Sequence, residues 1–223
     1  MIPAEHREYP ISVGGRTVHL LGPADPDALC DDPDVERRFQ QDKYLPYWAT
    51  PWPAAVMLAN HLRQRLAPGP GPILELGAGL GLVGISLALA GHRVVVTDYD
   101  QDALRFVRLN AARAGVTLGG VHRLDWRDPP PERYATIVAA DVLYERRNHQ
   151  PLARFLAAGL AERGTAWICD PDRGAAVGFD DALRAEGLVS HTSPARAPAL
   201  SPLDTVDRRE VTGTIHHILR RPP

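Results

Sequence analysis

The 223-residue sequence predicts an α/β fold, a three-layer Rossmann-like arrangement with a seven-stranded, mostly parallel sheet and the last strand antiparallel. Two observations lead to this prediction. Between residues 73 and 192, short apolar runs alternate with helical patterns of roughly 10 to 15 residues, which is typical of βαβ units and a sheet covered on both faces. The closing run Arg208–Leu219 is β-rich and no helical pattern follows it, so we expect this strand to pair antiparallel beside the preceding one.

The N-terminal region is predicted to be a short extension of this fold. Ile11–Leu21 contains two short alternating runs around Gly14-Gly15, which predicts a hairpin. Val35–Lys43 has the pattern of a short helix. We therefore expect an extension over residues 1–45, packed on a main domain over residues 46–223.

The main domain is expected to begin with a helix over Ala54–Leu66. Pro53 suits the first turn of that helix, and the stretch from Pro68 to Pro72 cannot continue it. The predicted strands that follow are Ile73–Leu76, Arg93–Thr97, Gly120–Leu124, Thr136–Ala140, Thr165–Cys169, Val189–Thr192 and Arg208–Leu219. The helices between them are Leu82–Ala90, Gln101–Ala114, Gln150–Glu162 and Ala176–Glu186.

Composition and charge exclude several classes of protein. With 44% hydrophobic and 23% charged residues, the chain is an ordinary globular protein and not a disordered one. Its longest apolar stretch, Leu80–Gly91, is shorter than the about 20 residues of a membrane span, and Met1 leads into charged residues instead of a signal peptide. The net charge of -2 disfavours a nucleic-acid partner. Two cysteines, Cys30 and Cys169, without metal-ligand spacing, predict a cytoplasmic protein and no metal site.

A glycine loop lies where the first strand of the alternating region meets its helix. The glycines let the backbone approach a ligand, and two cofactors fit the pattern. Gly79, Gly81 and Gly84 have the spacing of a dinucleotide fingerprint, with Asp98 at the end of the next strand for ribose hydroxyls. The register disfavours this interpretation, because Gly77 already stands where the first fingerprint glycine belongs. A third interpretation is that the glycines only permit close packing of helix and strand.

The second cofactor follows from a family resemblance. The phrase Glu75-x-Gly77-x-Gly79-x-Gly81, followed by Asp98 at the end of the next strand, resembles the class I, seven-strand methyltransferases that use S-adenosylmethionine and release S-adenosylhomocysteine. The resemblance implies that Glu75 faces the methionine ammonium of the cofactor. It also implies that the glycine loop borders the methionine tail and that Asp98 binds the ribose diol.

Asp125-Trp126 ends the third predicted strand, where class I enzymes place an acid for the adenine amine. The resemblance implies that Asp125 accepts this amine and that Trp126 stacks on the purine. A structural interpretation stays open, in which Asp125 caps a turn and Trp126 fills the edge of the core.

Two further segments narrow the resemblance. Pro51-Trp52-Pro53 and Asp141-Val142-Leu143-Tyr144 look like methyltransferase family 16, which includes many protein-lysine methyltransferases, among them the electron-transfer-flavoprotein β-subunit lysine methyltransferase. The resemblance implies that Trp52 lines the methionine end of the cofactor. It also implies that Asp141 and Tyr144 border the target amine as catalytic residues, with Asp141 touching the cofactor as well. The structural alternatives are a hydrophobic anchor for Trp52, a turn cap for Asp141 and a core-edge aromatic for Tyr144.

These observations predict an S-adenosylmethionine-dependent methyltransferase that acts on a protein lysine by direct transfer. A methyltransferase for small metabolites is an alternative, with Tyr44, Tyr47 and Trp48 as a lid over the acceptor. Further alternatives are a non-catalytic module that binds the cofactor and a nicotinamide-dependent oxidoreductase. His216-His217 falls in a predicted strand, so its rings point to opposite faces and cannot chelate a metal as a pair. The sequence determines neither the acceptor nor the oligomeric state.

Overall fold

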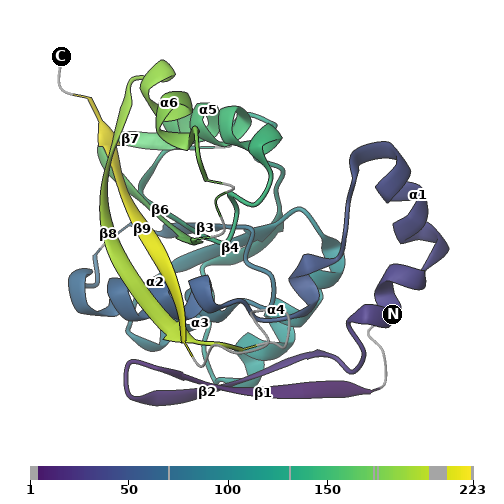
Figure 1. The fold of residues 1–223 in the computed structure, drawn as a ribbon. Coiled ribbons are helices and arrows are strands. Elements are labelled where there is room, and N and C mark those ends of the chain that lie inside the picture. The colour runs from purple at the N-terminus through teal and green to yellow at the C-terminus, as the bar shows by residue number, and fades with distance from the viewer. Residues whose placement is uncertain are drawn as a thin grey trace.

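The computed structural model describes residues 5–69, 71–130, 132–172, 174, 176–200 and 210–221. Its centre is a seven-stranded sheet (Figure 1). The strands are β3 (Ile73–Leu76), β4 (Val94–Asp98), β5 (Gly120–Arg123), β6 (Tyr134–Ala140), β7 (Leu160–Pro171), β8 (Leu188–Pro198) and β9 (Glu210–Arg220). They lie in the order β5-β4-β3-β6-β7-β9-β8, and β9 runs antiparallel to both of its neighbours. The predicted α/β sheet with an antiparallel last strand is therefore confirmed.

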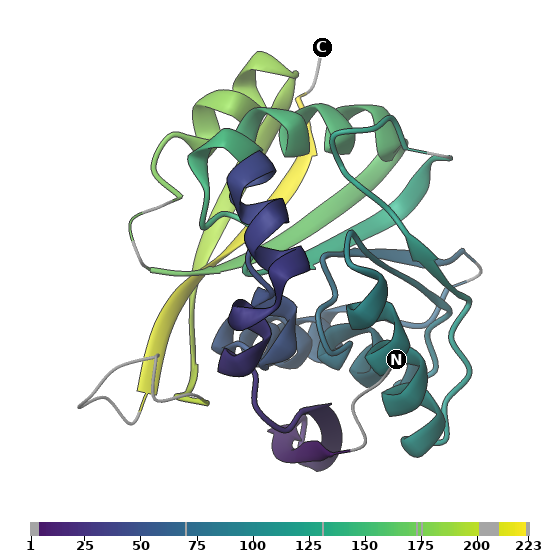
Figure 2. The same ribbon diagram turned by 90° about the vertical axis from the view of Figure 1, so that its right-hand side faces the viewer.

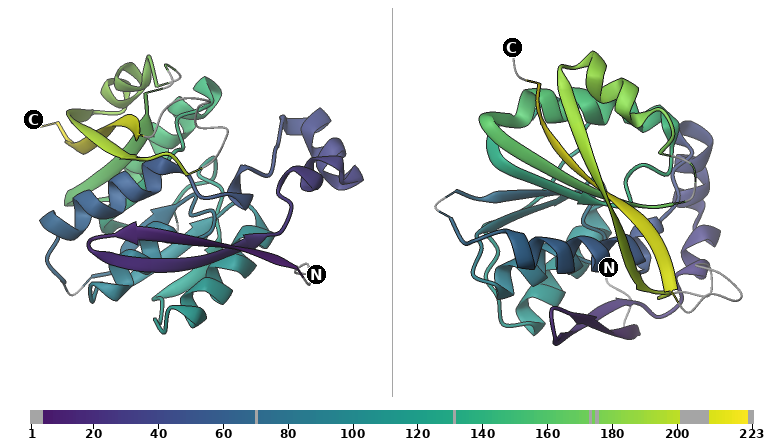
Figure 3. Two further views of the ribbon diagram at one scale, coloured as in Figure 1. Left: turned by 60° about the horizontal axis from the view of Figure 1, so that its bottom comes forward. Right: turned by 60° about the vertical axis from the view of Figure 1, so that its left-hand side comes forward.

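Helices cover both faces of this sheet. They are α2 (Pro53–Arg65), α3 (Leu82–Leu89), α4 (Gln101–Arg113), α5 (His149–Gly159) and α6 (Phe179–Ala185), while a further helix, α1 (Pro33–Asp42), lies outside these layers. One core cluster joins the sheet to α2, α3 and α4, and a second joins it to α5 and α6. Figure 3 shows the three layers from two further sides. Because helices cover both faces, the ligand site of such a sheet lies beyond the carboxyl ends of its parallel strands.

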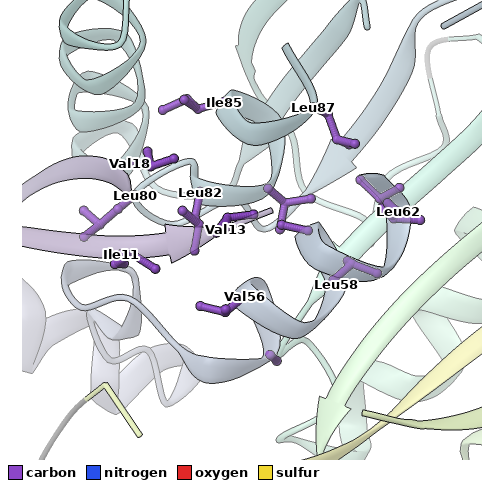
Figure 4. Close-up of a cluster of buried hydrophobic side chains, with 14 of the residues drawn as sticks. Ile11, Val13, Val18, Val56, Leu58, Leu62, Leu80, Leu82, Ile85 and Leu87 are labelled. Carbon is purple, nitrogen blue, oxygen red and sulfur yellow. The ribbon is translucent and has the colours of Figure 1, made fainter. Parts of the chain in front are cut away.

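The N-terminal hairpin is longer than the sequence predicts. It consists of β1 (His6–Val13) and β2 (Arg16–Pro23), joined at Gly14 and Gly15, whose φ angles of 58° and 76° suit a tight hairpin turn. The inward side chains Ile11, Val13 and Val18 are buried against α2 and α3 (Figure 4). The hairpin is thus part of the first core cluster.

Helix α1 differs from the hairpin, although both belong to the predicted extension. It begins at Pro33 after the N-cap Asp32, whose side chain accepts the Asp34 N–H, and none of its residues is buried. It stands away from the helical layers at the right of Figure 1 and crosses the front of the molecule in Figure 2. The boundary between residues 1–45 and 46–223 remains a prediction.

Two predicted helix bounds differ from the structure. The helix expected over Gln150–Glu162 ends at Gly159, because Leu160 is buried and pairs with Tyr134 as the first residue of β7. The helix expected from Ala176 begins at Phe179.

Strand β8 is longer than the predicted Val189–Thr192, whereas β9 ends one residue beyond the predicted Leu219. Strand β8 extends to Pro198, since it pairs with β9 along its whole length, from Leu188 opposite Arg220 to Pro198 opposite Glu210. Arg208 and Arg209 of the predicted last strand lie outside the described residues. Within the described ranges, no helix combines the length and apolar character of a membrane span.

Candidate active site

A cavity of about 180 Å³ opens at the carboxyl ends of β3, β4 and β6. The segment from the end of α1 to the start of α2 forms its opposite wall. The lining includes all but one of the residues that the sequence analysis selects, namely Trp52, Glu75, Gly77, Gly79, Asp98, Asp125, Trp126, Asp141 and Tyr144. The fold therefore brings residues from five separate chain segments to one place.

Gly81 is the selected residue that does not line the cavity. It is the N-cap of α3 with a φ of 88°, and a Cβ atom there would lie 3.2 Å from Val107 and 3.3 Å from Ile85. A side chain at this position would therefore point into the hydrophobic core and not into the cavity. Gly81 lets the chain turn from the loop into the helix, whereas Gly77 and Gly79 border the cavity.

Glu75 lies in the middle of β3 and is buried between the strand and α3. No hydrogen bond of standard geometry from the described residues reaches its Oε2 atom. A Cβ atom on Gly84 would lie 2.3 Å from this oxygen, so glycine is needed where α3 passes over the carboxyl group. Burial raises the pKa of Glu75 to about 8, against a smaller lowering by the Gly84 backbone. The site therefore favours a neutral carboxyl group until a cation lies beside it.

Asp98 ends β4 and ties that strand to the glycine loop. Its Oδ2 accepts the Gly79 N–H at 2.9 Å, and its Oδ1 accepts the Asp100 N–H at 2.8 Å. Burial raises the pKa of Asp98 to about 6, although these N–H donors act in the opposite direction. The carboxylate thus fixes the loop and also lines the cavity.

Asp125 and Trp126 follow β5. Arg127 holds both carboxylate oxygens of Asp125, with Nε 2.9 Å from each and Nη2 2.7 Å from Oδ2. The Arg127 N–H also donates to Oδ1 at 2.9 Å, so Asp125 caps a turn as well as lining the cavity. The Trp126 ring lies beside the loop, since a Cβ atom on Gly77 would be 3.3 Å from its Cζ3 atom.

The Asp141–Tyr144 segment follows β6. Asp141 has a φ of 56°, a left-handed conformation that is uncommon for residues other than glycine and concentrates at functional sites. Its N–H donates to the Cys169 carbonyl at 2.8 Å, which holds this turn against β7. Val142 and Leu143 are buried, while Tyr144 is 38% exposed. The segment thus anchors itself with its two apolar residues and presents Asp141 and Tyr144 to the cavity.

A second, outer hollow of about 240 Å³ adjoins the cavity. Its lining consists of Tyr47, Trp52, Asp141, Tyr144 and Glu145, all of which also line the inner cavity. The Tyr47 ring meets those of Trp52 and Tyr144 edge to face, at centroid distances of 6.2 and 5.3 Å. Aromatic rings together with carboxylates are the groups that bind an organic cation.

Glu145 is a member of this hollow that the sequence analysis missed. Its Oε2 atom accepts hydrogen bonds from Arg147 Nε at 2.7 Å and from Asn148 Nδ2 at 3.2 Å. The signal available in the sequence was its position directly after Tyr144, at the carboxyl end of a predicted strand. That its side chain lines the hollow depends on the conformation of the loop after β6, which the sequence pattern does not show.

The two histidines of β9 lie on opposite faces, as predicted. The His217 ring stacks on Trp167 with centroids 3.9 Å apart, and His216 Nδ1 lies 3.1 Å from Ser190 Oγ. Among the described residues, no group of three or more histidine, cysteine or acidic side chains is arranged to hold a metal ion.

Comparison with known proteins identifies the family of this chain. The family model of lysine methyltransferases matches residues 38–175. Protein N-lysine methyltransferase METTL21A of Xenopus tropicalis is 36% identical over 113 residues, which cover 47% of this chain and 52% of that protein. Histone-arginine methyltransferase METTL23 of Rattus norvegicus is 41% identical over 70 residues, 30% of this chain and 31% of that protein.

The chain spans about half the length of the N-lysine methyltransferases that it matches. Among solved structures, the ribosomal protein L11 methylase of Lactobacillus delbrueckii subsp. bulgaricus has the same fold, with a TM-score of 0.57 at 19% identity over 74% of this chain and 77% of that one. The matched residues 38–175 include the glycine loop, Asp98 and the Asp141–Tyr144 segment. The chain therefore belongs to the lysine methyltransferase family, methyltransferase family 16.

Proposed function

We propose that this protein is an S-adenosylmethionine-dependent N-methyltransferase that acts on a lysine side chain of a protein. The observation that carries the proposal is that two adjoining cavities share five lining residues, among them Asp141 and Tyr144. The inner cavity contains the glycine loop, and the adjoining outer hollow is lined by aromatic rings and carboxylates. A cofactor in the first space and a cationic side chain in the second would meet there. The family of the chain supports lysine as the acceptor.

The residues of the inner cavity suit the charges of the cofactor. Glu75 offers a buried carboxyl oxygen without a standard hydrogen bond, which fits the methionine ammonium. Asp98, fixed by the loop, fits the ribose diol. Gly77 and Gly79 leave room for the methionine tail between them, and Trp52 would close that end of the cavity.

The adenine end is proposed to lie between Asp125 and Trp126. Trp126 provides a flat apolar wall beside Gly77. Arg127 supplies three N–H donors to Asp125, one of them shared by both oxygens, and a carboxylate has about four acceptor positions. Asp125 would accept the exocyclic amine of adenine at the remaining position while it keeps the ion pair with Arg127.

The sulfonium of the bound cofactor supplies an activated methyl group, so the protein has to align the acceptor and exclude water. A lysine with an ordinary pKa of about 10.4 must lose its proton, at a cost of about 4.6 kcal/mol at pH 7. We assign Asp141 to orient the amine and not to act as a general base, since a carboxylate beside an ammonium stabilises the charged form. The proton would leave through water, and Tyr144 would shape the channel.

The test is transfer of labelled methyl groups from S-adenosylmethionine to protein and protein-free fractions of a cell extract. We expect label on a protein acceptor, and we expect it to disappear when one lysine of that acceptor is changed. Asp98→Ala should abolish transfer, and Tyr144→Phe should slow it. Tyr134→Phe is the matched control, because Tyr134 is buried in the second core cluster away from the cavity.

Other outcomes would favour the alternatives. If the label appears only in the protein-free fraction, the acceptor is a small molecule and the lysine proposal is wrong. Binding of S-adenosylhomocysteine without transfer to any fraction would indicate a non-catalytic module. The cytoplasmic location expected from the two cysteines remains part of this proposal, and fractionation of the source cells tests it.

A further inference from the structure

Helix α1 borders the cofactor cavity although it has no buried residue. Its last residue, Asp42, and the following Lys43 and Tyr44 line the cavity. Figures 1 and 2 show the helix standing outside the helical layers. Since burial of apolar side chains is the main force that holds elements together, α1 must be held mainly by other contacts.

Those contacts are charged, and Asp42 has two of them. Its Oδ2 atom accepts a hydrogen bond from Arg127 Nη1 at 2.6 Å, and its Oδ1 atom accepts one from Arg147 Nη1 at 3.1 Å. Its backbone carbonyl accepts a third hydrogen bond, from Arg147 Nη2 at 2.5 Å. The end of α1 is thus tied to the loop after β5 and to the loop after β6.

Each arginine also holds a carboxylate of the site. Arg127 holds Asp125 at the proposed adenine end, and Arg147 holds Glu145 in the outer hollow. The five side chains form one continuous ionic network across the cavity mouth, with Asp42 at its centre. All five line the inner cavity.

We propose that Asp42 is a positioning residue that ties α1 across the mouth of the cavity. The proposal rests on the proposed function, because the ligand retained there is the cofactor. Through Arg127 and Arg147, Asp42 also orients Asp125 and Glu145. Loss of its charge frees the end of α1 and speeds release of the cofactor.

The exposure of these groups explains why a network is required. The side chains of Asp42, Arg127 and Arg147 are 38%, 43% and 46% exposed. Single ion pairs at such exposure contribute little, whereas several charges that share one geometry hold it better. Screening by salt weakens them, so the strength of the closure depends on ionic strength.

A second clasp lies one turn earlier and does not replace the first. Arg38 Nη1 donates to Asp100 Oδ2 at 3.0 Å, and Tyr44 also donates to Asp100, which is buried at the start of α4. This clasp joins the middle of α1 and Tyr44, two residues after its end, to one side of the cavity at the start of α4. Asp42 joins the end of the helix to both sides, so its loss has an effect that Asp100 does not offset.

The experiment compares Asp42→Asn with wild type. The dissociation rate of S-adenosylhomocysteine is measured by stopped flow, using the tryptophans that line the cavity, at 50 and 300 mM salt. We expect dissociation from Asp42→Asn to be about fivefold faster at low salt, with the salt dependence largely lost. Asp42→Glu should restore part of the slow release.

Asp34→Asn is the matched control, because Asp34 lies on the same helix and pairs with Arg37 within it, outside the cavity. Equal dissociation rates for Asp42→Asn and Asp34→Asn, with wild-type melting temperatures, would overturn the inference. A wild-type protein that does not bind S-adenosylhomocysteine would overturn the proposed function instead.

Double variants test whether Asp42 acts through its arginines. The release rate of Asp42→Asn combined with Arg147→Gln should be slower than the product of the two single effects predicts, since the Asp42–Arg147 ion pair is lost in either single variant. Effects that multiply would show that Asp42 and Arg147 act independently and would contradict the positioning role.

Discussion

At the scale of single residues, Glu75 combines two opposing demands. Burial between β3 and α3 disfavours its charge and raises its pKa from 4.5 to about 8, but the proposed ammonium partner requires that charge. Binding of a cation therefore releases a proton at neutral pH. We therefore expect a neutral group at this position to stabilise the protein without its ligand.

Glu75→Gln should separate stability from binding. Because the folded pKa lies above the unfolded value, the stability that Glu75 contributes is present below pH 4.5 and is lost as the pH rises to about 8. Glutamine does not titrate. At pH 8 we expect the variant to have a higher melting temperature than wild type, by about 2 to 4 °C for each kcal/mol of free energy of unfolding gained. We also expect it to bind S-adenosylmethionine at least tenfold more weakly.

Thermal melts at pH 4.5 and pH 8, together with calorimetric titration, check this prediction. The gain in melting temperature should be absent at pH 4.5. The exposed Glu162, changed to glutamine, is the control and should behave as wild type. A Glu75→Gln variant that melts below wild type at pH 8 would contradict the account of the buried charge.

At the scale of elements, the joint between β3 and α3 determines whether the site forms. The loop leaves β3 and enters the helix through three glycines with positive φ, at 61°, 55° and 88° for Gly77, Gly79 and Gly81. Gly84 has an ordinary helical conformation, yet a Cβ atom there would collide with Glu75 and, at 2.6 Å, with Val96. Its role is steric, since it lets the helix lie directly on the carboxyl group.

Gly84→Ala should therefore destabilise the protein although alanine favours helices. We expect a loss of about 1 to 3 kcal/mol from overpacking and a marked loss of cofactor affinity. Ser86→Ala is the matched control on the same helix, because the Ser86 hydroxyl is buried without a hydrogen-bond partner among the described residues. Urea unfolding of both variants checks the prediction, and a Gly84→Ala protein as stable as Ser86→Ala would refute it.

At the scale of the whole molecule, the cavity lies where the two core clusters and the end of α1 come together. The first core cluster fixes β3, α3 and the hairpin, the second fixes α5 and α6, and the Asp141–Tyr144 segment joins them at the sheet edge. The α1 end closes the mouth through charges. A ligand in the cavity should therefore stabilise the fold as a unit.

S-adenosylhomocysteine at about 100 times its Kd should stabilise the folded state by about 2.7 kcal/mol, a rise of roughly 5 to 11 °C in melting temperature. NAD(H) at the same concentration should have no effect, because Glu75 and Gly77 occupy the start of the dinucleotide fingerprint. Scanning calorimetry with each ligand checks both statements. Stabilisation by NAD(H) alone would favour the oxidoreductase alternative.

Much of the fold could be predicted from the sequence because its signals are local. The bounds predicted for Ile73–Leu76 are those of the structure, since a short, mostly aliphatic run stands between prolines and glycines. The helix expected to end at Glu162 ends earlier in the structure, because Leu160 pairs with Tyr134 as part of a strand. This contact joins residues far apart in the sequence, so the local helical pattern does not reveal it.

Local signals are enough to predict the α/β class, the glycine loop and the acids at the ends of strands, because periodicity and turn residues depend on near neighbours. The folded structure was needed to show that Gly81 faces Val107, that Arg127 holds Asp125, and that Glu145 lines the outer hollow. It also decided that Asp42 lies between two arginines from loops 85 and 105 residues away. These contacts join distant segments, so their geometry exists only after the sheet has brought its carboxyl ends together.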